Sequence, residues 1–338
     1  MSSLKKRVLK GSAWSFGGYG TNQVIRLGSN LILTRLLFPE AFGLMSLVQV
    51  FMQGLEMFSD IGINPSIIQN ERRDPDFLNT AWTIQIIRGF LLWIGACLLA
   101  WPAAQFYNEP TLMQLLPVVG LTTIIRGFRS TKIAVSNREL HLARPILIEL
   151  GSYILGVITM ISIALVYPSV WALVFGGIVG AVSNTISSHL FLSGEKNRLA
   201  WDSSAVQAIK NFGKWIFFST LVTYLAGEGD RLVLGNLFSF ELLGIFSIAN
   251  MLSQTVNKAI QRVSGQVLFP SYAEIIRERP HKLYVHLRKS RIIIIVALWI
   301  PALIFIFFGD QIIDFLYDDR YSDAGWMLQV FALGQLVG

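Results

Sequence analysis

A stretch of forty residues occurs twice in this chain, and this internal repeat constrains the fold more than any other feature of the sequence. Residues 14–53 align without a gap with residues 215–254, and ten of the forty positions are identical. Each copy reads as two membrane helices joined by a short connector, which is Leu-Phe-Pro-Glu-Ala-Phe-Gly in the first copy. Because repeats of this kind are common in secondary transporters, the sequence predicts a duplicated helical fold.

Polar residues recur along the second helix of each copy. In the first copy they are spaced by three or four residues, which places them on one helical face: Ser46, Gln49, Gln53, Glu56 and Asp60. The second copy has a polar residue at every corresponding position: Ser247, Asn250, Gln254, Asn257 and Gln261. Polar groups are costly inside a bilayer, so we expect the two stripes to line a cavity. The alternative is hydrogen bonding between helices without a ligand.

The composition indicates a polytopic membrane protein. Of the 338 residues, 53% are hydrophobic and only 14% are charged, whereas typical soluble domains carry about 25% charged residues. The net charge of +7 does not indicate a nucleic-acid partner, because the basic residues lie between apolar segments rather than on one domain. The single cysteine, Cys97, permits no intrachain disulfide and no cysteine-based metal site. We therefore expect no cofactor and no metal.

Ten segments are apolar and long enough to read as membrane spans, each of which needs about 20 residues. They are Ser12–Leu36, Phe42–Ile63, Ala81–Ala103, Leu112–Ile125, Ile146–Val166, Val170–Leu192, Phe212–Leu237, Leu242–Val263, Ile292–Phe308 and Ala324 to the end. We predict a first six-helix bundle over 1–192, a cytoplasmic linker over 193–211, and a second bundle of about four helices over 212–338. A complete second copy would need two more helices, so we expect the chain to be a fragment of a longer protein.

The distribution of basic residues predicts the orientation. With the N-terminus in the cytoplasm, the inner segments hold 22 of the 28 Lys and Arg residues, and the outer connections hold only Arg35 and Arg320. Cytoplasmic loops carry such an excess in membrane proteins. The outer connections are all short, which argues against a membrane-bound polysaccharide polymerase or ligase, because such an enzyme needs a sizeable outer loop.

Several charged residues fall within the predicted spans. Arg26 and Arg88 have no acidic residue within one turn of their own helices, so their partners are acids of neighbouring helices or an anionic ligand. The planar guanidinium suits a pyrophosphate, because it binds phosphate oxygens with two hydrogen bonds. Arg231 lies close to Glu228 and Asp230, for which internal ion pairing and a role in transport are equal alternatives.

Three stretches carry a resemblance to a known family: residues 33–44, 60–69 and 267–275. They resemble the bacterial polysaccharide transporter family, the Wzx-type flippases that include the colanic-acid-exporter branch. The resemblance implies two helical bundles around a central cavity that opens alternately to each side of the bacterial inner membrane. It implies as substrate an oligosaccharide on a polyprenyl pyrophosphate carrier, moved from the cytoplasmic to the outer leaflet. Membrane lipids, polysaccharide polymerase and chain-length proteins would be its partners.

The candidate sites follow from the polar residues of the spans together with this resemblance. We predict that arginines hold the pyrophosphate and that amides meet sugar hydroxyls. The predicted substrate-binding residues are Arg26, Arg88, Arg231, Asn22, Asn30, Gln49, Gln53, Asn250 and Gln254. The candidates for ion coupling are Glu56, Asp60, Glu228 and Asp230.

A multidrug antiporter and a membrane enzyme are the two alternatives to the flippase. A cation-coupled multidrug antiporter of the same superfamily would need a cavity with net negative charge. The sequence has no His/Cys set with metal-ligand spacing, no Walker-type loop and no His-Glu-x-x-His motif. We therefore expect a transporter and not an enzyme.

Overall fold

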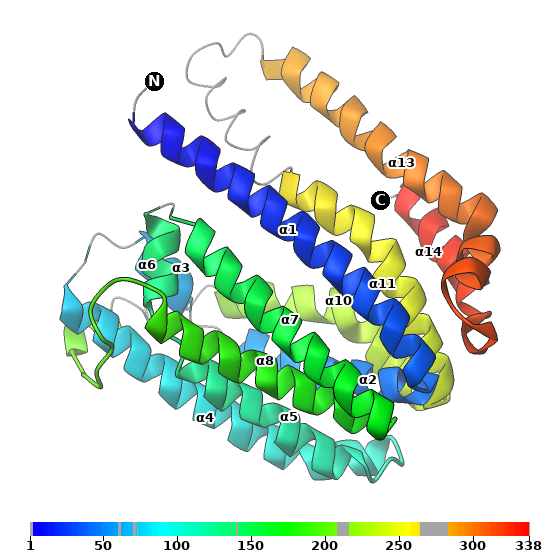
Figure 1. Cartoon of the computed structure of the whole chain (residues 1–338), viewed down its shortest axis with the longest axis horizontal. Helices are drawn as coiled ribbons and strands as arrows, with labels where there is room; N and C mark the ends of the chain where they lie inside the picture. Colours follow the sequence, from blue (N-terminus) through cyan, green and yellow to red (C-terminus); the bar gives the residue numbers. More distant parts are fainter. Residues whose placement is uncertain are drawn as a thin grey trace. The chain divides into compact units, whose positions relative to one another are not determined.

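The protein is an all-α polytopic membrane protein (Figure 1). The computed structural model describes residues 3–59, 62–69, 72, 74–139, 141–207, 216–263 and 283–337, and it contains no strand within these ranges. Five of the helices in this part of the chain are long and apolar enough to cross a membrane. The apolar segments are Pro39–Phe58, Pro75–Phe106, Ala143–Val166, Val170–Leu190 and Ser290–Leu316.

The helices follow one another with short connections. Those of the first two thirds of the chain are α1 (Ser3–Leu36), α2 (Pro39–Phe58), α3 (Ile63–Gln69), α4 (Pro75–Phe106), α5 (Leu112–Gly127), α6 (Lys132–Arg138), α7 (Ala143–Val166), α8 (Val170–Leu190) and α10 (Ile216–Leu237). The remainder are α11 (Phe240–Val263), α13 (Leu283–Leu316), the 3-10 turn η3 (Asp319–Tyr321) and α14 (Ala324–Val337).

Each of the ten predicted spans contains a described helix, but the second span runs past the end of α2 at Phe58 and the sixth past the end of α8 at Leu190. Five of them meet the length and hydropathy expected of a membrane span, and for the other five the crossing stays a prediction. The sequence did not predict the short helices α3 and α6. The second predicted span was too long at its end, because α2 is capped at Ser59 and Gly62 then adopts a positive φ of 68°, a conformation that only glycine takes readily.

The chain divides into two compact units, Met1–Phe240 and Glu241–Gly338. Helix α10 therefore belongs to the first unit, where it packs against α2. The hydroxyl of Tyr224 donates a hydrogen bond to the carbonyl of Val50 at 3.1 Å, and the hydroxyl of Tyr107 donates to the carbonyl of Leu232 at 3.0 Å. The bundle boundaries expected from the repeat, and the duplication itself, stay predictions.

Close helix pairs build the first unit, and glycines allow them to approach. A Cβ atom on Gly89 of α4 would lie 2.6 Å from the carbonyl oxygen of Thr123 on α5. The hydroxyl of Thr123 donates to the carbonyl of Gly89 at 2.9 Å, so the two backbones are in direct contact. Helices α7 and α8 form a similar pair, in which a Cβ on Gly156 would lie 2.8 Å from the carbonyl oxygen of Gly176. Small residues commonly serve this purpose in membrane helices.

The segment that follows α8 is fixed to the first unit over its described residues, 193–207. Its backbone N–H groups donate to side chains of α4: Arg198 to Asn79, Ala200 to Thr83 and Asp202 to Thr80, at 3.0–3.1 Å. Ala205 is fully buried in an apolar cluster with residues of α3, α4 and α6. This part of the predicted linker is thus packed onto the first bundle.

In the second unit, α11, α13 and α14 contribute the contacts that the structure describes. Helix α13 is irregular at Phe308 (φ −123°, ψ 15°). The rings of Phe246 on α11 and Phe331 on α14 meet edge to face at 5.1 Å. The amide of Gln335 donates to the carbonyl of Ser253 at 2.9 Å, which joins α14 to α11.

Candidate functional site

Arg88 of α4 reaches across to the end of α2. Its Nε donates to the hydroxyl of Ser59 at 3.0 Å, and a terminal nitrogen donates to the backbone carbonyl of Glu56 at 2.6 Å. The sequence predicted an acidic side chain or an anionic ligand as the partner of Arg88. The two described contacts of Arg88 are with a hydroxyl and a carbonyl, neither of which carries a negative charge, and the anionic ligand stays a prediction.

The carboxylate of Glu56 pairs with a different arginine. It lies 3.2 Å from Arg126, the last basic residue of α5, and the two side chains are 39% and 58% exposed. Glu56 was predicted as an ion-coupling candidate, and that role stays a prediction. Because the pair is well exposed, it contributes little to stability and can exchange partners readily.

Arg129 follows α5 by two residues and completes a group of three arginines. Burial lowers the pKa of the Arg129 guanidinium, and the positive charge of Arg126 lowers it further, whereas Glu149 on α7 acts in the opposite direction. The amide nitrogen of Gln85 on α4 lies 3.0–3.1 Å from the carbonyl oxygens of Arg126, Gly127 and Arg129. We call Arg88, Arg126 and Arg129 the arginine cluster. It is assembled where the ends of α2 and α5 meet α4.

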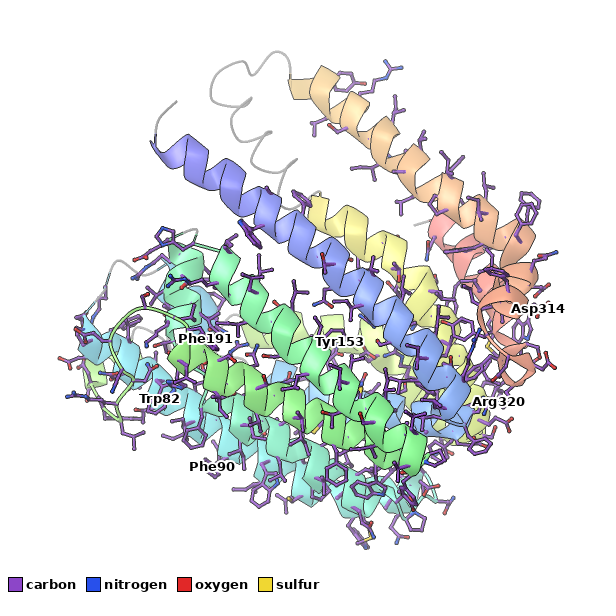
Figure 2. The ribbon with its side chains drawn as sticks, viewed as in Figure 1. Trp82, Phe90, Tyr153, Phe191, Asp314 and Arg320 are labelled. Atoms are coloured by element: carbon purple, nitrogen blue, oxygen red, sulfur yellow. The ribbon has the colours of Figure 1, made fainter. Side chains whose placement is uncertain are left out.

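Arg26 lies in the middle of α1 and is half-buried. Within the part of the chain that the structure describes, its guanidinium makes no hydrogen bond and no ion pair. One turn further, the hydroxyl of Ser29 lies 3.5 Å from that of Tyr153 on α7 (Figure 2), so this side of α1 faces α7. Asn22 and Asn30 are half-buried on the same helix. No described contact joins Arg26 to the arginine cluster.

The polar residues predicted to form one stripe on α2 differ in their burial. Gln49 and Gln53 are exposed, and the only described contact of the Gln53 amide is a long one of 3.8 Å to the sulfur of Met57. Ser46 is buried, and its hydroxyl has no hydrogen-bond partner among the described residues. Asp60 lies outside the described residues.

The charged residues of α10 pair with one another. Arg231 lies 2.9 Å from the carboxylate of Glu228, and their side chains are only 21% and 13% exposed. The carboxylate of exposed Asp230 accepts from the backbone N–H of Arg231 at 2.7 Å. The sequence left internal ion pairing and a role in transport open for these residues. The contacts described here are those of internal pairing. In the second unit, Asn250 is buried and Gln254 is exposed.

The described residues contain no group of three or more His, Cys, Asp or Glu side chains that could hold a metal ion.

Residues 32–325, most of the chain, match the model of a family described as polysaccharide biosynthesis protein. The chain belongs to this family. Several curated relatives support the assignment. They include the lipopolysaccharide biosynthesis protein WzxC of Escherichia coli K12, which is 24% identical over 85% of this chain. A membrane protein in the cps region of Klebsiella pneumoniae is 22% identical over 81%, and the succinoglycan biosynthesis transport protein ExoT of Rhizobium meliloti 1021 is 19% identical over 74%.

The chain spans about half the length of these curated relatives: the aligned part covers 58%, 57% and 51% of them. No solved structure matches the chain.

For this member of the polysaccharide biosynthesis protein family, sequence reasoning missed two of the three arginines in the cluster. The sequence places Arg126 and Arg129 among the basic residues of a cytoplasmic segment, and this location stays a prediction. The signal that could have found them is the short length of α5, 16 residues. Because α5 is short, Arg126 at its end lies beside Glu56 of α2.

Proposed function

We propose that this chain belongs to a flippase that moves oligosaccharide repeat units, linked to polyprenyl pyrophosphate, from the cytoplasmic to the outer leaflet of a bacterial inner membrane. Family membership and a relative named as a succinoglycan biosynthesis transport protein support a role in polysaccharide transport. The observation that carries the proposal is the half-buried guanidinium of Arg26 in the middle of α1, which has no hydrogen-bond or ion-pair partner among the described residues. We take α1 to be a membrane span, as predicted from the sequence.

The physical argument concerns the cost of that charge. An arginine at the centre of a membrane helix costs roughly 2.5 to 3.5 kcal/mol on insertion scales, and such residues usually face a cavity or a partner. Arg26 has no partner in the described chain, so an anionic ligand is the simplest reason for its position. A pyrophosphate offers several oxygens in the geometry that a guanidinium binds with paired hydrogen bonds.

The arginine cluster extends this proposal to the approach of the substrate. Arg88, Arg126 and Arg129 lie toward the end of the first unit that carries most of its basic residues, which we take as cytoplasmic, with the N-terminus on the same side. They would attract the pyrophosphate before it reaches Arg26. In the duplicated arrangement, with bundles over 1–192 and 212–338, rocking of the two bundles would expose the site alternately.

The remaining predicted residues take subsidiary roles in this proposal. Exposed Gln49 and Gln53 would meet sugar hydroxyls, and Asn250 and Gln254 keep the same role as candidates predicted from the sequence. Glu56 and Asp60 remain the candidates for ion coupling. Polysaccharide polymerase and chain-length proteins would receive the translocated unit.

The test uses the full-length gene in a strain that makes a surface polysaccharide. The gene is deleted, and the leaflet that holds the lipid-linked repeat unit is determined by its access to an added glycosidase. The deletion is complemented with wild type, with Arg26→Ala and, as a matched control that keeps the charge, with Arg26→Lys. We expect cytoplasmic accumulation that wild type relieves fully, Arg26→Lys in part and Arg26→Ala not at all.

Two outcomes would argue against the proposal. Normal surface polysaccharide in the deletion strain, without a redundant transporter, would rule out the flippase. Full rescue by Arg26→Ala would leave the flippase standing but remove Arg26 as a ligand of the pyrophosphate.

A further inference from the structure

A cavity of about 720 Å³ opens at one end of the α7–α8 pair. Its lining includes Arg144, Leu147, Ser152, Ser183, Ser187 and Phe191, all from the first unit (Phe191 is labelled in Figure 2). None of these residues belongs to the arginine cluster or to the predicted substrate-binding set. The volume lies within the range of about 300–1,000 Å³ that is usual for small-molecule sites.

The cavity arises from the way the two helices pack. At Gly156 and Gly176 the backbones touch, because neither helix has a side chain there. Toward the start of α7 and the end of α8, the facing residues are the small serines Ser152, Ser183 and Ser187. Small side chains on both helices leave space beyond the backbone contact, and this space is lined by hydroxyl groups.

Ser152 provides a hydrogen-bonding group that nothing in the described chain uses. The residue is only 4% exposed, and its hydroxyl has no hydrogen-bond partner among the described residues. A serine in a helix often donates to the carbonyl one turn earlier, as Ser247 does to Leu243. Ser152 does not do so, and buried polar groups are normally satisfied. Because Ser152 lines the cavity, rotation of its side chain would bring this buried hydroxyl to a ligand oxygen there.

The rest of the lining is positively charged at one side and apolar at the other. Arg144 is exposed, donates to the hydroxyl of Ser193 at 2.9 Å and has no ion pair in the described part of the chain. Leu147, Leu190 and Phe191 form an apolar wall and are 54%, 71% and 64% exposed. A ligand that fits this arrangement has an anionic oxygen group and an apolar chain in the same molecule.

We propose that this cavity binds an anionic membrane phospholipid, with its phosphate between Arg144 and the serine hydroxyls and its acyl chains along Leu147, Leu190 and Phe191. Basic pockets between membrane helices at the cytoplasmic side are recurrent sites for anionic lipid head groups. The site does not depend on the proposed transport function, because it uses a face of α7 and α8 that the substrate model does not involve.

The test measures lipid retention by the purified full-length protein with native mass spectrometry. Phosphatidylglycerol is the anionic probe, and phosphatidylcholine, whose phosphate carries a compensating ammonium, is the comparison. The variants are Arg144→Gln, Ser152→Leu and Ser187→Leu, the last two of which fill the cavity from opposite helices. Lys196→Gln is the matched control, because Lys196 is an exposed basic residue close in sequence that does not line the cavity.

We expect wild type and Lys196→Gln to retain phosphatidylglycerol in preference to phosphatidylcholine. Arg144→Gln should bind it about tenfold more weakly, as expected for the loss of one charge-assisted hydrogen bond. At least one of the two leucine variants that folds, as judged by circular dichroism, should do the same. Equal retention of the two lipids by wild type would overturn the proposal. So would phosphatidylglycerol binding by Arg144→Gln and a folded leucine variant at the level of the control, or selective retention of a polyprenyl phosphate in place of phosphatidylglycerol.

Discussion

The carboxylate of Glu56 on α2 lies 3.2 Å from the guanidinium of Arg126 at the end of α5. The same residue accepts a hydrogen bond from Arg88 through its backbone carbonyl. One acidic residue thus contacts two arginines through different groups. The exposed carboxylate can release Arg126 to an incoming anion while the carbonyl keeps Arg88 in position.

Replacing Arg126 by glutamine separates binding from stability. The pair with Glu56 is well exposed, so its loss should lower the free energy of unfolding by no more than about 1 kcal/mol. If the arginine cluster attracts a pyrophosphate, export should nevertheless fall by at least about tenfold, the effect of one charge-assisted hydrogen bond. Complementation of the deletion strain measures export, and thermal unfolding of the purified variant measures stability. Arg126→Lys, which keeps the positive charge, should retain part of the export and serves as the control. Normal export by Arg126→Gln would exclude Arg126 from the substrate path.

The pair of Glu228 and Arg231 on α10 should be structural. Both side chains are largely buried, and removing one partner of such a pair leaves an uncompensated charge at a cost of about 3–5 kcal/mol. We expect Arg231→Met to lower the amount of folded protein strongly, and the double variant Glu228→Gln/Arg231→Met to recover much of it. Fluorescence-detected size-exclusion chromatography measures both. A double variant that folds but does not export would instead give Arg231 the substrate-binding role predicted from the sequence.

Two adjacent glycines of α8 should respond in opposite ways to alanine. A Cβ on Gly176 would lie 2.7 Å from the carbonyl of Gly156, whereas a Cβ on Gly177 would meet nothing within 4 Å. Gly176→Ala should therefore destabilise the protein by about 1–3 kcal/mol through overpacking. Gly177→Ala should be neutral or stabilise it by up to about 1 kcal/mol, because alanine restricts the unfolded chain. Thermal unfolding of the two variants distinguishes these effects, and equal midpoints would contradict the close α7–α8 contact.

Acid should loosen the attachment of residues 193–207 to the first unit. Hydrogen bonds from Arg72 to the Asp74 carboxylate lower the pKa of Asp74 from 3.8 to about 2, and hydrogen bonds from Ser204 and Arg72 lower the pKa of Asp202. A depressed folded-state pKa stabilises the protein above the unfolded value and loses its effect as the pH falls through the folded value. The contribution of Asp74 should thus be complete above about pH 5 and disappear between about pH 4 and pH 2.

Asp74→Asn tests this pH dependence without disturbing the helix cap. The Asp74 side chain accepts from the backbone N–H of Phe77 at the start of α4, and asparagine caps helices equally well. The variant should unfold at a lower temperature than wild type at pH 7, and the two unfolding curves should converge as the pH approaches 2. A constant difference over the whole range would show that the charge of Asp74 contributes nothing.

The sequence predicted the helices well and their contacts poorly, for a physical reason. Long apolar segments have few alternatives to the helix in a membrane, so each of the ten predicted spans contains a described helix, although two spans run past the ends of α2 and α8. Contacts such as that of Arg88 with a backbone carbonyl follow no side-chain pattern. The same holds for residues 193–207, which are held by their own backbone N–H groups. Helices α3 and α6 are too short to give a hydropathy signal from which a helix could be predicted.

Gln85 gives the turn after α5 a fixed shape before any ligand arrives. Its single amide nitrogen lies within hydrogen-bonding distance of three carbonyl oxygens of this turn, those of Arg126, Gly127 and Arg129. Ordering a loop normally consumes part of the free energy of binding. Because Gln85 already orders the turn after α5, the conformational entropy of this turn is lost during folding and not during binding. An anion that binds beside this turn would therefore meet two arginines at a spacing already set, and a modest number of contacts could yield useful affinity.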